Sequence, residues 1–194
     1  MRRVCVFCGS NLGARAEYAE SARRLGSALA RRGIGLVYGG ASVGLMGVLA
    51  EAVLAADGEV IGVIPRALAT REVAHTGLSE LRVVGSMHER KALMAELADA
   101  FVALPGGFGM LDELLEVITW AQLGLHRKPI GLLDVAGYFG GLLALVEHAI
   151  AERFVHAGHR ALLVCTAEVD DLLDTISTWR PPPAPRKWLS LDET

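Results

Sequence analysis

Short apolar runs alternate with longer segments of helical period along most of the chain. The helical segments repeat their apolar residues every three or four positions, as amphipathic helices do. The short runs are apolar throughout, which is typical of strands that helices bury on both faces. We therefore expect an α/β protein in which a parallel sheet is covered by helices on both sides. The predicted strands span residues 3–9, 34–39, 59–65, 81–85, 99–104, 129–134 and 162–166, and the predicted helices span 16–32, 43–56, 86–98, 109–123, 138–153 and 167–179.

Length and composition fit one domain with a large core. The chain has 194 residues, of which 52% are hydrophobic and only 21% are charged, and this balance excludes an intrinsically disordered protein. The segment after residue 180 opens with PPPAP and contains few apolar residues. We predict a single domain over residues 1–180 and an extended Pro-rich tail over residues 181–194.

The charge balance narrows the expected partners and location. Lysine and arginine number 19 against 22 acidic residues, which gives a formal net charge of −3. A protein that grips a phosphodiester backbone needs a basic excess, so nucleic acid is not an expected partner. No apolar stretch approaches the ~20 residues that span a bilayer, and the opening MRRVCVFCGSN turns polar too early for a signal peptide. The sequence predicts a cytoplasmic protein with no membrane partner.

Cys5 and Cys8 have the C-x-x-C spacing, but both fall in the apolar run VCVFC. A redox pair with this spacing lies after a strand at the start of a helix, and a zinc site needs two further ligands that Cys165 alone cannot provide. We interpret both thiols as buried strand residues. The sequence also lacks a dinucleotide G-x-G-x-x-G turn, a P-loop and an H-E-x-x-H pair, so neither a metal nor a cofactor is expected.

The most informative segment is PGGFGMLDE, residues 105–113, between a predicted strand and a predicted helix. Turns at the carboxyl edge of a parallel sheet form ligand sites, and glycines let the backbone approach a ligand closely. The following helix directs its unpaired N–H groups and positive dipole end at the same place, which suits an anion such as phosphate. Asp112 and Glu116 fit a simple complement to the dipole, whereas Glu113 can lie over the turn. The alternative is that the glycines serve only a tight strand-to-helix turn.

A second charged cluster opens the helix predicted over residues 86–98, in the segment SMHERKALM. Arg90 and Lys91 lie near the N-terminus of this helix, where cations oppose the helix dipole. We therefore expect them to serve a ligand, with Glu113 as the natural partner of the Arg90 guanidinium when the pocket is empty. A solvated charged face is the alternative.

PGGFGMLDE resembles the P-G-G-x-G-T-x-x-E signature of the Lonely Guy (LOG) family, the cytokinin riboside 5′-monophosphate phosphoribohydrolases. The segments CVFCGSN, LVYGGASVGLMG, VIGVIPRAL, MHERKALM and EVITWAQLGLHRKPIGLLDVAGYF have counterparts in the same order, so the resemblance covers residues 3–179. It implies a Rossmann-like three-layer α/β/α fold with a mainly parallel sheet of about seven strands. It also implies a homodimeric hydrolase that cleaves the N-glycosidic bond of N6-substituted adenosine 5′-monophosphates, or of AMP, to free base and ribose 5-phosphate.

The resemblance also implies roles for individual residues. By motif position, Arg90 and Glu113 are the catalytic pair, and a carboxylate beneath C1′ stabilises the oxocarbenium ion that forms as the glycosidic bond breaks. The phosphate loop falls at Gly106, Gly107, Gly109 and Met110. Further substrate contacts fall at Glu72, Lys91, Phe108, Leu111, Asp112 and Thr119, and Ser10, Gly39 and Gly40 line the same edge.

Similar sequences carry a lysine decarboxylase label, which we discount. A pyridoxal enzyme needs a Schiff-base lysine and a partner for the pyridinium nitrogen. The chain offers only Lys91, Lys128 and Lys187 for the first of these roles.

Met110 departs from the family pattern, which has threonine at this position. The change removes a hydroxyl that caps the helix and donates to phosphate, while the backbone N–H is kept. The alternative function is a non-catalytic nucleotide or molybdenum-cofactor binder of the same fold. Met110 favours that alternative, whereas Arg90 and Glu113 favour the enzyme. An apolar surplus on the helix predicted over residues 109–123 supports the expected homodimer.

Overall fold

One seven-stranded parallel sheet forms the centre of the computed structural model, which describes residues 1–69, 75 and 77–182. Its strands are β1 (Arg3–Phe7), β2 (Gly35–Tyr38), β3 (Val60–Pro65), β4 (Glu80–Val84), β5 (Ala100–Ala103), β6 (Ile130–Leu133) and β7 (Leu163–Thr166). Their spatial order is β4-β3-β2-β1-β5-β6-β7, and each neighbouring pair is parallel. The predicted α/β fold is confirmed, and every predicted strand is present.

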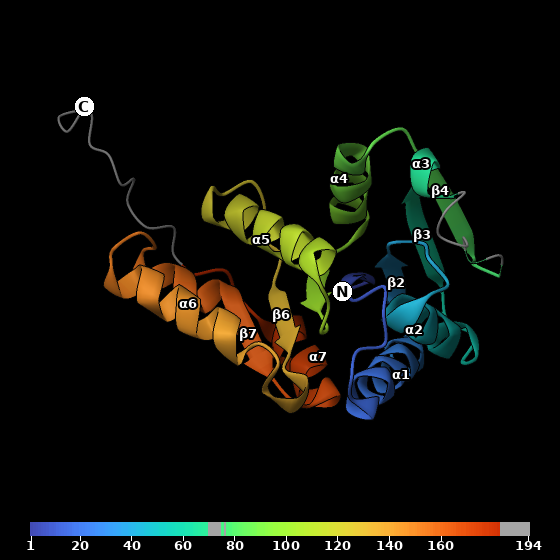
Figure 1. Cartoon of the computed structure of the whole chain (residues 1–194), viewed down its shortest axis with the longest axis horizontal. Helices are drawn as coiled ribbons and strands as arrows, with labels where there is room; N and C mark the ends of the chain where they lie inside the picture. Colours follow the sequence, from blue (N-terminus) through green and yellow to red (C-terminus); the bar gives the residue numbers. More distant parts are fainter. Residues whose placement is uncertain (70–74, 76, 183–194) are drawn as a thin grey trace.

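Helices cover both faces of the sheet, so the molecule has three layers (Figure 1). The helices are α1 (Ala16–Arg31), α2 (Gly44–Leu54), α3 (Arg66–Ala69), α4 (Met87–Leu97), α5 (Phe108–Gln122), α6 (Gly140–Ala151) and α7 (Val169–Thr178), with 3-10 turns η1 (Val135–Gly137) and η2 (Ala157–Leu162). Helices α1, α2 and α7 pack on one face, and α4 and α5 pack on the other. The six predicted helices are confirmed, whereas α3, η1 and η2 are too short to show a helical period in the sequence.

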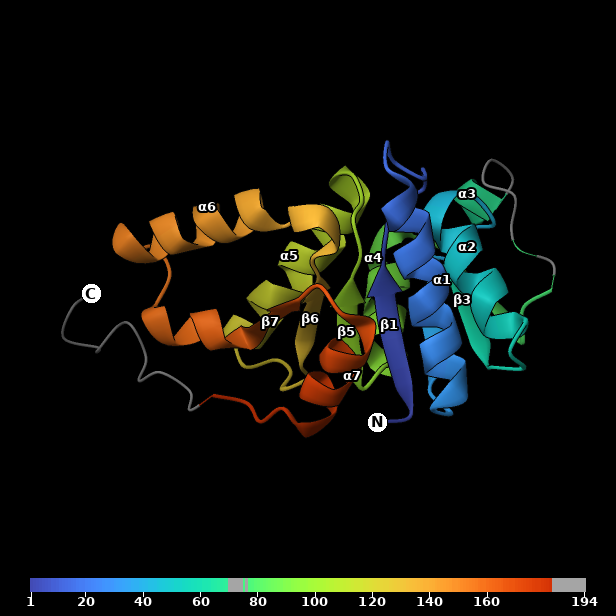
Figure 2. The ribbon, with the colours of Figure 1, turned by 90° about the horizontal axis from the view of Figure 1, so that it is seen from below.

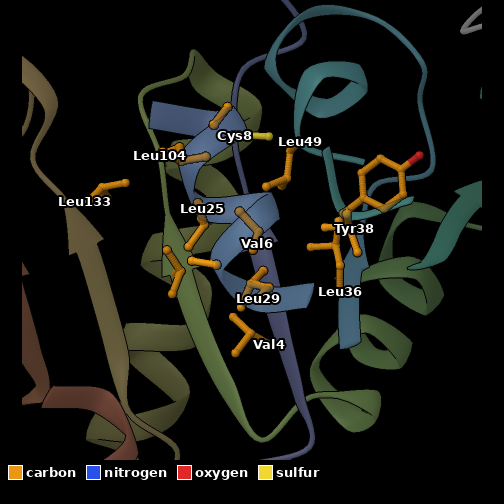
Figure 3. Packing of buried hydrophobic residues seen from close by; sticks show 14 of the residues in the cluster. Val4, Val6, Cys8, Leu25, Leu29, Leu36, Tyr38, Leu49, Leu104 and Leu133 are labelled. Carbon is orange, nitrogen blue, oxygen red and sulfur yellow. The ribbon is translucent and has the colours of Figure 1, made fainter. Parts of the chain in front are cut away.

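Two apolar clusters, one on each face of the sheet, make up the core. Along β1, Val4 and Val6 point to the face of α1 and α2 (Figure 3), while Cys5 and Phe7 point to the face of α4 and α5. Successive strand residues alternate between faces, so a strand buried on both sides must be apolar throughout.

The thiols of Cys5 and Cys8 are free and buried, as predicted. Burial is the main cause that raises the pKa of both thiols well above the usual value for cysteine, and the charge of Glu113 raises it further. Both thiols therefore stay protonated at neutral pH and are neither nucleophiles nor a redox pair.

Helix α6 differs from the other long helices because none of its residues is buried. It extends along the β6–β7 end of the sheet (Figures 1 and 2) and exposes Leu145, whose exposed fraction is 62%. Its sequence, GGLLALVEHAIA, is nevertheless strongly apolar. Within the described part of the chain, no helix combines the length and apolarity needed to cross a membrane.

Candidate active site

A cavity of about 370 Å³ opens at the carboxyl edge of the sheet, between the ends of β1 and β5. This is where strand order reverses direction, the place at which open α/β sheets bind ligands. Its size lies within the range of ~300–1,000 Å³ that is usual for small-molecule sites. The cavity is lined by Val6, residues 8–13, Tyr18, Gly39, Leu45, Met46, Arg90, residues 105–110, Glu113 and Tyr138.

The turn from β5 to α5 forms one wall of this cavity. Gly9 donates its backbone N–H to the carbonyl of Pro105 at 3.0 Å, which ties this turn to the loop after β1. A Cβ on Gly106 would lie 2.8 Å from the Gly9 nitrogen and 2.8 Å from the Met110 Cβ, so only glycine fits there. The N–H of Leu111 donates to the Gly107 carbonyl at 3.1 Å. The N–H groups before Leu111 belong to the first turn of α5 and have no acceptor within the helix. The start of α5 therefore presents N–H groups and a positive dipole end that suit an anion.

The Arg90 side chain is held rigidly in another wall. Helix α4 begins with a capping box, in which Ser86 Oγ accepts from the Glu89 N–H at 3.1 Å and Glu89 Oε2 accepts from the Gly85 N–H at 2.7 Å. Arg90 follows directly and is only 8% exposed. Its Nε donates to the carbonyl of Val63, in β3, at 3.2 Å. The cap and this bond fix the guanidinium before any ligand arrives.

Gly39 makes room for that guanidinium. A Cβ at this position would lie 2.1 Å from Arg90 Nη2, so the guanidinium could not stay where it is. The glycine after β2 is therefore required by the arginine that lies over it.

Glu113 on α5 faces Arg90 across the cavity wall, with Oε1 3.5 Å from Arg90 Nη2. Burial is the main cause that raises the pKa of Glu113 from 4.5 to about 7, while the positive charge of Arg90 opposes the rise and the negative charge of Asp112 adds to it. A carboxyl with this pKa both accepts and releases a proton near neutral pH. Such a shift inside a cavity is typical of catalytic acids and bases.

Lys91 points to a different place. Its Nζ lies 3.1 Å from Asp112 Oδ2 and 3.1 Å from Glu116 Oε1, and none of these three residues lines the cavity. Burial opposes the charge of Lys91, but its bonds to Asp112 and Glu116 outweigh burial and raise its pKa. The two acids therefore do more than complement the helix dipole, because with Lys91 they tie α4 to α5. In the described structure Lys91 pairs with these acids and does not line the cavity, and its contact with substrate stays a prediction.

The predicted site residues fall into three groups. Nine of them line the cavity: Arg90, Glu113, Ser10, Gly39, Gly106, Gly107, Phe108, Gly109 and Met110. Five do not: Gly40, Lys91, Leu111, Asp112 and Thr119. The carbonyl of Gly40 accepts from the His75 N–H at 3.2 Å, and Thr119 Oγ1 donates to the carbonyl of Leu115 at 2.8 Å within α5. Glu72 lies outside the described residues.

Met110 reaches the cavity with little of its surface. It is only 2% exposed and belongs to the apolar cluster between the sheet and α4 and α5. Its side chain therefore fills core volume at the point where the family pattern has a hydroxyl.

Tyr138 and Tyr18 line the cavity but were not predicted. Tyr138 donates its hydroxyl to the carbonyl of Gly106, and its ring meets that of Tyr18 edge-on at 5.9 Å. Tyr138 follows a predicted strand at the same edge of the sheet as the glycine turns, so its place in the chain was a usable signal. Tyr18 lies within α1, where no sequence pattern marks it.

The chain is similar in sequence to a family model and to several curated proteins. The family model described as "Possible lysine decarboxylase" matches residues 46–176. The probable cytokinin riboside 5′-monophosphate phosphoribohydrolase LOGL5 of Oryza sativa subsp. japonica is 53% identical, over 94% of this chain and 74% of its own length. The cytokinin riboside 5′-monophosphate phosphoribohydrolase LOG7 of Arabidopsis thaliana is 49% identical, over 93% of this chain and 83% of its own length.

Solved structures with the same fold are more distant in sequence. The molybdenum cofactor binding protein of Rippkaea orientalis superposes with a TM-score of 0.69 at 20% identity, over 92% of this chain and 97% of its own. The molybdenum cofactor carrier protein of Chlamydomonas reinhardtii gives a TM-score of 0.69 at 20% identity, over 91% and 96%. At this identity the likeness extends to the fold alone.

Proposed function

Because this chain belongs to the Lonely Guy family of cytokinin riboside 5′-monophosphate phosphoribohydrolases, we propose that it binds N6-substituted adenosine 5′-monophosphates, or AMP, in the cavity at the carboxyl edge of its sheet. It is a hydrolase that cleaves the N-glycosidic bond of these nucleotides and releases the free base and ribose 5-phosphate. The observation that carries the location of the chemistry is the buried pair of Arg90 and Glu113 in the cavity wall.

Glu113 carries the reaction at C1′. As the bond between C1′ and N9 breaks, its electron pair stays with the purine and positive charge develops on the ribose. The ionised carboxylate stabilises that charge and takes a proton from the water whose oxygen bonds to C1′. That proton then passes through solvent to the purine anion, which gives the neutral free base and returns Glu113 to its ionised form. With a pKa of about 7, Glu113 is ionised in a large part of the molecules at neutral pH and still basic enough to accept this proton.

Arg90 and the glycine turn hold the substrate in place. The guanidinium keeps the Glu113 carboxylate oriented and offers further N–H donors to the ribose hydroxyls or the phosphate. The N–H groups at the start of α5 donate hydrogen bonds to the 5′-phosphate. Both elements line the same cavity, so one nucleotide reaches the turn and Glu113 together.

The direct test is release of free base. We expect the protein to release adenine from AMP and isopentenyladenine from isopentenyladenosine monophosphate, with one ribose 5-phosphate for each base, as measured by chromatography. Lysine offered with pyridoxal phosphate serves as a control and should give no product. Tight binding of both nucleotides without any free base would instead support the non-catalytic binder.

We also propose that the protein is a homodimer. Leu145 on α6 and Leu115 and Leu123 on and after α5 are 62%, 46% and 65% exposed, although all three are large apolar side chains. Helix α6 has no buried residue, so a second copy of the chain is the cover that its apolar face needs. Light scattering at micromolar concentration should give twice the monomer mass, and Leu145→Glu should lower that mass toward the monomer. A monomeric parent protein would contradict this proposal.

A cytoplasmic location is the final part of the proposal. Three cysteine thiols are free, which fits a reducing compartment, and the nucleotide substrate is found inside cells. Fractionation of cells that express the protein should recover the hydrolase activity with the cytosol.

A further inference from the structure

Tyr138 sits on a sharply defined turn between β6 and α6. Asp134 Oδ1 accepts from the Phe139 N–H at 2.7 Å, which closes the turn. Ala136 and Gly137 are both left-handed, with φ of 54° and 73°, and alanine rarely adopts this conformation. The turn brings Tyr138 to the cavity that also holds Arg90.

The Tyr138 ring is held on two sides, and its hydroxyl has a single defined acceptor. The ring meets Tyr18 edge-on at 5.9 Å and Phe139 edge-on at 5.2 Å. The hydroxyl donates to the carbonyl of Gly106, in the turn from β5 to α5. Tyr138, which follows β6, is therefore hydrogen-bonded to the peptide that joins Gly106 to Gly107.

The hydrogen bond to the Gly106 carbonyl also orients the N–H of Gly107. Within residues 1–69, 75 and 77–182 there is no cis peptide, and in a planar trans peptide the N–H points opposite to the C=O. The Tyr138 hydroxyl therefore sets the direction of the Gly107 N–H as well as that of the Gly106 carbonyl. Gly107 is the N-cap of α5 and precedes the N–H groups that suit an anion.

Two consecutive glycines make such a clamp useful. Glycine has the widest backbone freedom, so the peptide between Gly106 and Gly107 is the one in this turn that rotates most easily. A Cβ on Gly107 would meet no described atom within 4 Å, so packing does not restrain that side of the peptide. Gly106 is packed against Gly9 and Met110, and the Gly107 carbonyl accepts from Leu111, so in the described structure the bond from Tyr138 is the restraint that acts directly on the carbonyl between these two glycines.

We propose that Tyr138 is a positioning residue of this hydrolase, and that its hydroxyl holds the Gly106–Gly107 peptide so that the Gly107 N–H meets the 5′-phosphate of the substrate. This inference rests on the proposed function, since it assumes that a phosphorylated ribose binds at the start of α5. It assigns Tyr138 a role in recognising the phosphate and none in bond breaking.

The test is Tyr138→Phe, which keeps the ring contacts and removes the hydroxyl. Loss of one hydrogen bond that orients the phosphate site should raise KM for AMP about three- to tenfold and leave kcat within about twofold. Hydrolysis of adenosine, which lacks the phosphate, should keep its kcat/KM. Tyr38→Phe is the matched control, because Tyr38 is fully buried and does not line the cavity, and its KM for AMP should equal that of the parent.

A purely structural role predicts a different pattern. If AMP and adenosine lose kcat/KM equally, or if KM for AMP does not change, the proposal is overturned. Tyr138 is 39% exposed, so its hydroxyl contributes little to the core and the melting temperature of Tyr138→Phe should stay close to that of the parent.

Binding of ribose 5-phosphate, measured by calorimetry, separates this proposal from the proposed function. The parent should bind ribose 5-phosphate about three- to tenfold more tightly than Tyr138→Phe, whether or not it releases base from AMP. A parent that binds ribose 5-phosphate but releases no base would contradict the hydrolase and leave the role of Tyr138 supported. Equal binding by parent and variant, or no binding by the parent, would overturn the role of Tyr138.

Discussion

Two groups of ion pairs join the same two helices, α4 and α5, and differ in their surroundings. On the cavity side, Arg90 faces Glu113, and their side chains are 10% and 9% exposed. On the outer side, Lys91 pairs with Asp112 and Glu116, whose side chains are 59% and 26% exposed. The basic members are neighbours in the chain, and so are Asp112 and Glu113.

The environment of a carboxyl group, and not the residue type, separates the reactive Glu113 from the structural Asp112. Successive residues of a helix point about 100° apart, so one of two adjacent charges faces the cavity and the other faces outward. Burial raises the pKa of Glu113 to about 7, because water cannot stabilise its charge. In the outer group Lys91 is 11% exposed, about as buried as Arg90, but its partners Asp112 and Glu116 keep contact with solvent, and the group joins the two helices.

The strongest test of this difference is Glu113→Gln against Asp112→Asn. Both changes replace a carboxylate by an amide of the same shape. We expect kcat for AMP to fall about a hundredfold or more in Glu113→Gln, because the charge that stabilises the oxocarbenium ion is lost, with KM nearly unchanged. Asp112→Asn should keep kcat within about threefold. Comparable losses in the two variants would show that the two sides are not different in function.

Arg90→Lys should have the next largest effect. The guanidinium fork holds the Val63 carbonyl and faces Glu113 at once, and a lysine ammonium cannot reproduce that geometry. We expect kcat/KM for AMP to fall on the order of tenfold or more, with changes in both kcat and KM. If the steady-state kinetics of Arg90→Lys match those of the parent, Arg90 contributes only its charge.

Stability should respond in the opposite direction to activity. Glu113 keeps its proton in the folded state up to a pKa of about 7 but ionises near 4.5 when unfolded. The contribution of Glu113 to the free energy of unfolding is fully present below pH 4.5 and is lost as the pH rises through about 7. The loss is about 3 kcal/mol. The free energy of unfolding of Glu113→Gln, relative to the parent, should therefore rise between pH 4.5 and pH 8 in urea titrations. A difference that does not vary with pH would contradict the raised pKa.

Lys91→Met should have the smallest effect and links the two sides. The Lys91 charge lowers the pKa of Glu113, so its removal should raise that pKa further. We expect the acid limb of the pH profile of kcat/KM to move to higher pH by about half a pH unit, because Glu113 then loses its proton at a higher pH. A higher KM for AMP at every pH, with no shift of the limb, would instead mean that Lys91 contacts substrate, as its motif position implies.

The sequence predicts the sheet well because buried parallel strands leave a strong pattern. Their continuous apolar runs and the glycines after β1, β2 and β5 mark both the strands and the edge at which the cavity opens. The short helix α3 and the turns η1 and η2 leave no such pattern, since each has too few residues for apolar positions to recur several times.

The site could be predicted only in part, for two physical reasons. Glu113 and the glycine turn line the same cavity, which the sequence could indicate because both belong to one short segment. The direction of Lys91 depends on how α4 packs against α5, which local sequence does not specify. Tyr138 acts through a contact with Gly106, 32 residues away in the chain, and neither residue alone indicates it.

Gly39 has a consequence for how this chain can change over generations. Alanine at this position would displace the guanidinium of Arg90 while that arginine is present, because the added carbon and Nη2 would overlap. Once Arg90 is gone, the same alanine meets no such obstacle from it. The two positions are therefore epistatic: replacement of Gly39 disturbs the guanidinium only while Arg90 is present, and after loss of Arg90 it has no further effect through this contact. A related chain with a larger residue at this position is therefore expected either to lack the arginine or to hold its guanidinium elsewhere.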